Sequence, residues 1–300
     1  MEKKIRFQYL FEKMADDLES LVLRGQINLT PPPTEKIIAC PFCLRCFTLQ
    51  ALKNDVILPE HVPARAMGGK VQTLTCADCN HRHGARFEGA LVERLRYEEL
   101  GTLVPGSRAE SIFIYDGNEI NTHVTFLGEK NFRFNFDPAK SHPRHTEIIQ
   151  DMLSQENLPD ITFVPKKKFN ERNSELGVLR TAYLKLFVEF GYKFLINENL
   201  EIVRKQLKDP EVNLLSDCGI VDKHVPNELP RLGLVLEPMH LQSYFVCVEL
   251  KSKSGTEFRF GVLLPLPKID GVDIYTYSAE YNSSGNWPEL TIKPLKSSVT

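Results

Sequence analysis

Two pairs of cysteines with metal-binding spacing lie in the first third of the chain. The first pair is Cys40 and Cys43, the second is Cys76 and Cys79, and residues 44–75 lie between them. Each Cys-x-x-Cys turn presents two sulfurs, and two such turns supply the four thiolates that a tetrahedral Zn²⁺ prefers. The spacing therefore predicts one structural zinc site on these four cysteines.

A third Cys-x-x-Cys pair overlaps the first, because Cys46 follows Cys43 by three positions. Cys46 is thus an alternative to Cys40 as a ligand. Pro41 and Phe42 suit a tight knuckle turn between Cys40 and Cys43, which favours Cys40.

A second set of polar side chains would be drawn together by that zinc. Glu60 and His61 are adjacent in the segment between the knuckles, and Asn80 directly follows Cys79. They offer a carboxylate, an imidazole and an amide, which are oxygen and nitrogen ligands of another kind than thiolate. We expect these three side chains to form the site at which the protein carries out its reaction.

This order of residues resembles the zinc-containing branch of the HNH endonuclease family. The resemblance covers residues 40–84 of the 300 and consists of a Cys-x-x-Cys pair, an acid followed by His, a Pro, a Gly-Gly and a Cys-x-x-Cys-Asn, here Cys40/Cys43, Glu60-His61, Pro63, Gly68-Gly69 and Cys76/Cys79-Asn80. It implies a ββα-metal module, in which a β-hairpin and a helix hold one divalent cation against a scissile phosphate.

The resemblance also implies roles for single residues. His61 would be the general base that takes a proton from the attacking water, while Glu60 and Asn80 would ligate the cation. His83 follows Asn80 by three residues on the expected helix and is a candidate third ligand. Backbone phosphates beside the cleaved bond would meet a set of basic side chains, namely Arg65, Lys70, Arg82 and Arg86.

The chemistry of these side chains agrees with the resemblance. Hydrolysis of a phosphodiester needs positive charge at the phosphate oxygens and a base for the water. A carboxylate and an amide are hard ligands suited to Mg²⁺ or Mn²⁺, and an imidazole with a pKa of about 6.5 suits the base. Because neighbours on a strand face opposite ways, Glu60 and His61 need a bent or twisted strand end.

The sequence departs from the family at the Asn that braces the loop beneath the site. That position falls on Val71, with Gln72 and Thr73 beside it. Val71 favours a second hypothesis, a zinc-dependent module that binds nucleic acid without cutting it.

The elements that must position these residues can be read along the chain. Apolar residues at helical spacing predict an amphipathic helix over residues 2–24, and prolines at 31–33 mark a linker. We therefore divide the chain into a helix and linker (1–35), the zinc and HNH module (36–105) and an α+β domain (106–300).

The last domain is predicted to carry antiparallel strands. Expected elements are a meander (112–115, 120–127, 132–136), a helix ending near Gly191 with Arg180, Lys185 and Glu189 outside its apolar face, a short helix (200–207), a hairpin (244–250 with 257–264) and a strand at 272–279. The predicted fold class is α+β. No chemical constellation is evident after residue 106.

Composition limits the class of protein. The chain is 42% hydrophobic with a formal charge of −2, so a nucleic-acid surface must be a local basic patch. Five of seven cysteines fall within residues 40–79, which favours metal in a reducing compartment over disulfides. There is no signal-peptide pattern and no run of about 20 apolar residues, so we expect a soluble, cytoplasmic protein without a membrane partner.

Together these features predict a metal-dependent HNH endonuclease that hydrolyses DNA, with RNA left open as substrate. Zinc is the structural cofactor, and Mg²⁺ or Mn²⁺ the catalytic one. Family habit places such enzymes in restriction or antiviral defence. HNH modules are also commonly attached to sensing domains. The resemblance therefore implies a third hypothesis, in which the C-terminal domain binds a ligand or a partner protein and gates the nuclease. A homodimer would allow two-strand cleavage, and no interface residue is indicated.

Overall fold

The chain is described by a computed structural model that covers residues 2–137, 142–155, 161–222, 225–267 and 273–295. It divides into two compact units: a larger one of residues 1–91, 171–251 and 257–300, and a smaller one of residues 92–170 and 252–256. Both contain helices and antiparallel strands, so the predicted α+β class is confirmed.

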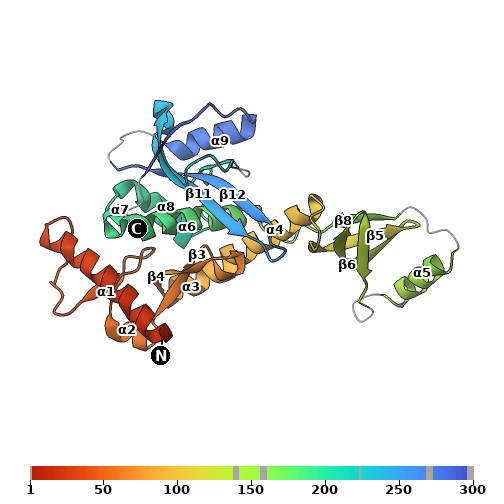
Figure 1. Ribbon diagram of the computed structural model, residues 1–300, viewed down its shortest axis with the longest axis horizontal. Coiled ribbons are helices and arrows are strands. Elements are labelled where there is room, and N and C mark those ends of the chain that lie inside the picture. The colour runs from red at the N-terminus through yellow and green to blue at the C-terminus, as the bar shows by residue number, and fades with distance from the viewer. Residues whose placement is uncertain (1, 138–141, 156–160, 223–224, 268–272, 296–300) are drawn as a thin grey trace. The chain divides into compact units, whose positions relative to one another are not determined.

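An antiparallel sheet of five strands forms the C-terminal part of the larger unit (Figure 1). The strands lie in the order β13-β10-β11-β12-β9, with bounds β9 (Ile220–Asp222), β10 (Leu232–Glu237), β11 (Ser243–Lys251), β12 (Glu257–Pro265) and β13 (Thr291–Pro294). β11 and β12 pair in register from Ser243↔Pro265 to Lys251↔Glu257. The predicted hairpin is confirmed, and its two strands carry much of the core.

The helix at the centre of this unit is α6 (Glu171–Phe190), which packs against β11, β12 and β3 (Ile57–Val62). Most of its residues are buried, and they fall on every side of the helix. A helix that is covered all round belongs to the interior. The prediction that Arg180 lies outside an apolar face is therefore wrong: its side chain is 1% exposed. Lys185 is also largely covered.

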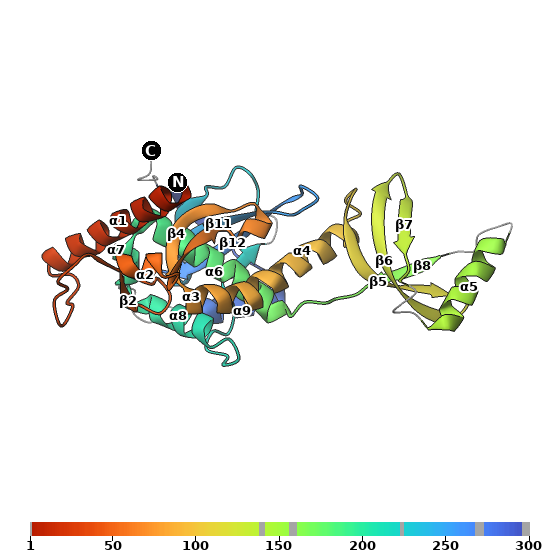
Figure 2. The ribbon, with the colours of Figure 1, turned by 90° about the horizontal axis from the view of Figure 1, so that it is seen from below.

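The predicted zinc segment folds as two hairpins followed by a helix. β1 (Ile37–Ala39) pairs with β2 (Cys46–Thr48), and β3 pairs with β4 (Lys70–Cys76). The remaining elements are α2 (Leu49–Lys53), η1 (Arg65–Met67), α3 (Ala77–His83), a π-helical turn η2 (Gly84–Glu88) and α4 (Gly89–Gly101). Figure 2 shows α3, η2 and α4 following one another as one helical run.

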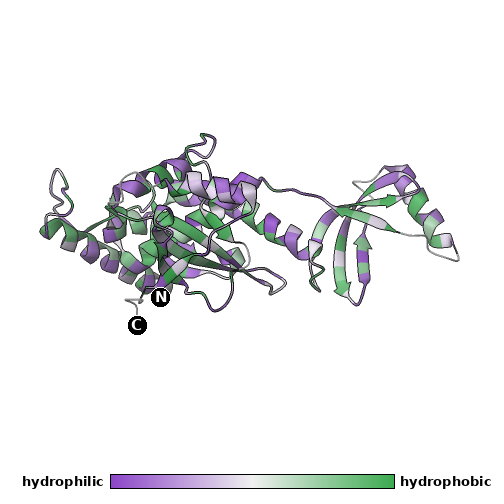
Figure 3. Ribbon diagram, turned by 90° about the horizontal axis from the view of Figure 1, so that it is seen from above, coloured by the Kyte–Doolittle hydropathy of each residue, from purple (hydrophilic) through white to green (hydrophobic). Residues whose placement is uncertain are grey.

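The N-terminal helix α1 (Glu2–Leu23) is confirmed, and it ends before Gly25 in the left-handed conformation. Its apolar side packs on the larger unit, since Phe11, Met14 and Leu18 are buried. Figure 3 shows hydrophobic and hydrophilic colour alternating along this helix, as the amphipathic spacing predicts.

Shorter elements complete the larger unit: α7 (Tyr192–Leu195), η4 (Glu198–Leu200), α8 (Glu201–Lys208), η5 (Met239–Leu241) and α9 (Ile274–Ser284). The predicted strand at 272–279 is wrong, because residues 274–284 form α9; residue 272 lies outside the described residues. Asp273 caps this helix by accepting hydrogen bonds from the backbone N–H groups of Tyr275 and Thr276.

The described residues of the smaller unit form a four-stranded sheet, helix α5 and the C-terminal part of α4. Its strands lie in the order β7-β6-β5-β8, with bounds β5 (Arg108–Tyr115), β6 (Asn118–Gly128), β7 (Asn131–Asn135) and β8 (Thr162–Pro165). The predicted meander is confirmed by β5, β6 and β7. Helix α5 (Pro143–Ser154) contributes Met152 to a core with Phe113 and Ile120.

None of the helices in the described ranges is both long and apolar enough to cross a lipid bilayer.

Candidate functional site

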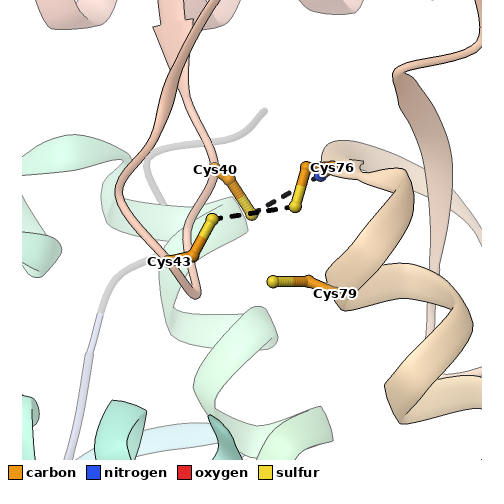
Figure 4. A group of neighbouring side chains, drawn as sticks. All are labelled: Cys40, Cys43, Cys76 and Cys79. Carbon is orange, nitrogen blue, oxygen red and sulfur yellow. Dashed lines mark hydrogen bonds between the residues drawn. The ribbon is translucent and has the colours of Figure 1, made fainter.

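The four predicted cysteines converge on one point of the larger unit. Figure 4 shows Cys40 and Cys43 from the first knuckle facing Cys76 and Cys79 at the start of α3. Their sulfur atoms all lie within 4.8 Å of one another, and the sulfurs of Cys43 and Cys76 are 3.7 Å apart. A tetrahedron with Zn–S distances of about 2.3 Å has S–S edges of about 3.8 Å. The four cysteines are therefore positioned to bind a metal ion, and the donor set fits structural zinc.

The alternative ligand Cys46 stands apart from this group. It is the first residue of β2 and is exposed, and the cluster contains Cys40 in its place. The choice of Cys40 over Cys46 is confirmed.

Helices α6 and α7 hold the first knuckle through two buried tyrosines. The Tyr192 hydroxyl accepts from the N–H of Ala39 at 2.8 Å and donates to the Ala39 carbonyl at 2.7 Å. The Tyr183 hydroxyl donates to the Pro41 carbonyl at 2.7 Å. The backbone N–H of Cys76 donates to the Cys40 sulfur at 3.5 Å. The knuckle is thus fixed to the core of the unit and to the second cysteine pair.

Arg45 supplies positive charge beside the sulfurs. Its guanidinium donates to Cys43 at 3.5 Å and to Cys76 at 3.4 Å, and it pairs with Asp78. Hydrogen bonds among the four cysteines lower the pKa of Cys43 and Cys76 and raise the pKa of Cys40 and Cys79. Thiolate is the form that binds metal, and the Arg45 guanidinium favours that form at Cys43.

The β3–β4 hairpin bends where Glu60 and His61 lie. Glu60 is opposite Thr73, but His61 is opposite Val71, so Gln72 is an extra residue on β4. Such a bulge turns the strand and re-aims its side chains, which satisfies the bent strand end expected from the sequence. The Gln72 amide donates to the Val62 carbonyl at 2.7 Å and braces the hairpin across the bulge.

The loop after His61 requires its second glycine. A Cβ on Gly69 would lie 1.5 Å from the carbonyl oxygen of Pro63, so no larger residue fits this crossing. The Gly69 N–H also donates to the Ala64 carbonyl at 3.2 Å. This close crossing holds the segment next to His61 in one shape.

Glu60 and Asn80 are in direct contact. The Glu60 carboxylate is 3% exposed and accepts from the Asn80 amide at 2.8 Å and from the Thr75 hydroxyl at 3.1 Å. The hairpin and α3 thus bring together the two residues that the sequence pairs as cation ligands.

A cavity of about 620 Å³ opens onto this contact. Glu60, His61 and Asn80 all line it, together with Arg65 and Glu88. Burial lowers the pKa of His61 despite the opposing charge of Glu60, and Arg65 and Arg6 lower it further. The imidazole is therefore neutral at pH 7, the form that a proton acceptor needs.

Glu88 was not indicated by the sequence pattern. An ideal helix turns 100° per residue, so a residue eight positions after Asn80 would point about 80° away. The π-helical turn η2 inserts one extra residue between them, which returns Glu88 to the side of Asn80. The result is a second carboxylate at the cavity, whose pKa is raised by burial.

Arg180 of α6 contacts both carboxylates, those of Glu60 and Glu88. Its Nη2 lies 2.9 Å from Glu60 Oε2, its Nη1 donates to Glu88 Oε1 at 2.7 Å, and its Nε donates to His83 Nδ1 at 3.2 Å. The guanidinium also lies 5.4 Å from the centre of the Phe42 ring, within the first zinc knuckle. One buried cation therefore connects the knuckle, the hairpin and the helical run.

His83 occupies the interior and does not line the cavity. It is 1% exposed, and its ring packs 4.4 Å from Phe42 and 5.2 Å from Phe87. Burial lowers its pKa to about 3, and the charge of Arg180 adds to this shift. In the structure His83 serves as an acceptor for Arg180.

The four predicted phosphate contacts differ in their surroundings. Arg65 is exposed at the cavity beside His61, and Lys70 is exposed on β4. Arg82 donates to the Lys208 carbonyl at 3.3 Å, and Arg86 pairs with Glu211. Arg65 and Lys70 therefore remain the pair open to a phosphate.

Comparison of the chain with protein-family models, curated proteins and solved structures gave no match. Its function must be argued from the residues and their geometry.

We expect Arg180→Met to destabilise the larger unit by about 3–5 kcal/mol, because it leaves two largely buried carboxylates without their counter-charge. Urea unfolding measures the change. Lys205→Met is the matched control, since Lys205 pairs with Glu201 at the surface and should leave the midpoint nearly unchanged. Equal midpoints for Arg180→Met and wild type would contradict the structural role given to Arg180.

Proposed function

We propose that this protein is a metal-dependent endonuclease of the HNH type that hydrolyses phosphodiester bonds in DNA. The observation that carries the proposal is one cavity lined by Glu60, His61 and Asn80, on a bulged hairpin and the helix after it. The four-cysteine cluster stands at the start of that same helix. The arrangement supports a ββα-metal module in which zinc is structural.

The donor atoms at this cavity fit a hard divalent cation. Glu60 and Asn80 touch each other, Glu88 adds a second carboxylate, and no sulfur lines the cavity. Mg²⁺ and Mn²⁺ prefer such oxygen ligands. Bound there, the cation supplies positive charge to the phosphate and leaving oxygens.

The residues around the cavity divide the remaining work. The neutral His61 imidazole takes a proton from the water that attacks phosphorus. Arg65, exposed at the same cavity, contacts a neighbouring phosphate and sets the register of the strand. Arg180 and Thr75 hold the Glu60 carboxylate in place.

Gln72 lies next to Val71, the position where the family has its bracing Asn. Val71 cannot donate a side-chain hydrogen bond, but the next residue, Gln72, bonds to the Val62 carbonyl across the hairpin. We infer that Gln72 takes over the bracing.

Cleavage of supercoiled plasmid is expected only with an added divalent cation. Purified protein is incubated with Mg²⁺, with Mn²⁺ or without either, and nicked and linear products are followed on a gel. Lack of cleavage under all three conditions would contradict the proposal. If such an inactive protein still retained labelled duplex, it would be the zinc-dependent nucleic-acid-binding module that Val71 favours.

A further inference from the structure

A second, larger cavity lies in the same unit, with none of its lining residues shared with the cavity of His61. It measures about 900 Å³ and forms a groove between the β3–β4 hairpin, α6 and the strands β10 to β12. Five cationic side chains and three carboxylates line it, although the chain as a whole carries a formal charge of −2. Its size is at the upper end of the range for small-molecule sites.

Lys185 is a covered cation in this groove that forms no ion pair with the described residues. Its ammonium donates to the Cys247 carbonyl at 2.8 Å, and no carboxylate of the described chain lies within ion-pair distance of it. An ammonium has three donors, so two remain available. A largely buried charge without a partner is costly unless something else supplies the opposite charge. Lys185 thus points to an anionic ligand.

The arginines beside Lys185 extend the positive surface. Arg231 and Arg259 share one carboxylate, with Nε atoms 3.3 Å and 3.9 Å from Glu249. The side chain of Arg259 is only 14% exposed. Two guanidiniums on one carboxylate leave positive charge unmatched, and a guanidinium fork fits a phosphate.

The opposite wall is largely apolar and comes from the hairpin that carries His61. Pro63 and Leu232 are partly exposed there, and the buried Val62, Met67 and Leu250 lie behind them. Lys70 lies on the same wall; it is exposed and forms no ion pair with the described residues. The groove therefore combines cations with a surface on which a flat ring can pack.

We propose that this groove binds a nucleotide, with Lys185 and Arg259 holding phosphate and the hairpin wall packing against the base. The nucleotide is either part of the strand being cut or a free nucleotide; the first source rests on the proposed nuclease function, and the second does not. Because Val62 and Pro63 directly follow His61, an occupant of the groove touches the hairpin of the catalytic base.

Binding is tested on the full chain without added Mg²⁺ or Mn²⁺, so that the result does not depend on cleavage. The probes are ATP, followed by calorimetry, and a short fluorescein-labelled DNA strand, followed by anisotropy. Lys185→Met is expected to weaken binding roughly 10-fold or more. Lys205→Met, which removes an exposed cation of α8, is expected to bind like wild type.

Thermal unfolding separates a binding role from a structural one. Lys185→Met removes a covered charge that forms no ion pair, so it should unfold no earlier than wild type. Weaker binding of ATP in this variant assigns a free nucleotide to the groove, and weaker binding of the DNA strand alone assigns the substrate strand. No binding of either probe to wild type, or equal binding to wild type and Lys185→Met, would overturn the proposal.

Discussion

The Cys79→Ser variant is expected to lose its zinc, and the start of α3 is expected to unfold in it. The Cys46→Ser variant is expected to keep its zinc and a folded α3. The sulfur of Cys79 is one of four that lie within 4.8 Å of one another, and Cys46 is exposed outside that group. Loss of a ligand should weaken zinc binding by more than the roughly 10–100-fold that loss of an outer contact costs. Zinc bound to a structural site contributes directly to folding free energy, so the melting temperature should fall as well.

The two cysteine variants form a matched pair, because both replace a thiol by a hydroxyl in the same region. Zinc content by elemental analysis and the melting temperature are measured on each. Zinc retained in Cys79→Ser, or lost in Cys46→Ser, would contradict the assignment of the four ligands.

The four-cysteine cluster could be predicted from the sequence because its chemistry is local. Each Cys-x-x-Cys turn sets the spacing of two sulfurs by itself, and only one long-range contact, between the two turns, had to be inferred. The hairpin of β11 and β12 was predictable for a similar reason, since it joins neighbours in the chain.

Arg180 could not be found in this way. It stands 97 residues from His83 and well over 100 from Glu60, and its helix reads as amphipathic when an apolar face is assumed. The structure buries α6 on all sides around Arg180, so this arginine pairs with Glu60 and Glu88. Apolar residues all round a helix are a signal of burial, and they would have placed Arg180 inside.

The roles of Glu88 and α9 were not predicted from the sequence, for two other reasons. Glu88 reaches the cavity only because η2 contains an extra residue, and helical periodicity with a fixed repeat does not anticipate such a turn. In α9 the run Ile274-Tyr275-Thr276-Tyr277 has strong strand propensity. The cap at Asp273 and burial of Ile274 and Tyr275 outweighed that propensity.

The sequence also gives no sign of which distant segments pack together. Residues 1–91 join residues 171–251 and 257–300 in one unit, and the strands β5 to β8 form another. Within the larger unit, residues 1–91 and residues 171–251 are joined by tertiary contacts such as that of Tyr192 with Ala39, which no local pattern encodes. Such contacts place α6 beneath the candidate active site.

The most direct test of the account is plasmid cleavage by His61→Ala beside wild type and His81→Ala. His61 lines the cavity with Glu60 and Asn80, whereas His81 is an exposed residue of α3 that does not line it. All three proteins should keep their zinc, because neither histidine belongs to the cysteine cluster. Zinc content therefore serves as the check that the module is intact.

Loss of a general base typically costs about 10²–10⁴-fold in rate. We expect His61→Ala to cleave slower by that factor, with His81→Ala close to the wild-type rate in the same Mg²⁺ or Mn²⁺ buffer. Cleavage by His61→Ala at the wild-type rate would contradict the assignment of His61 and, with it, the nuclease site proposed for this cavity.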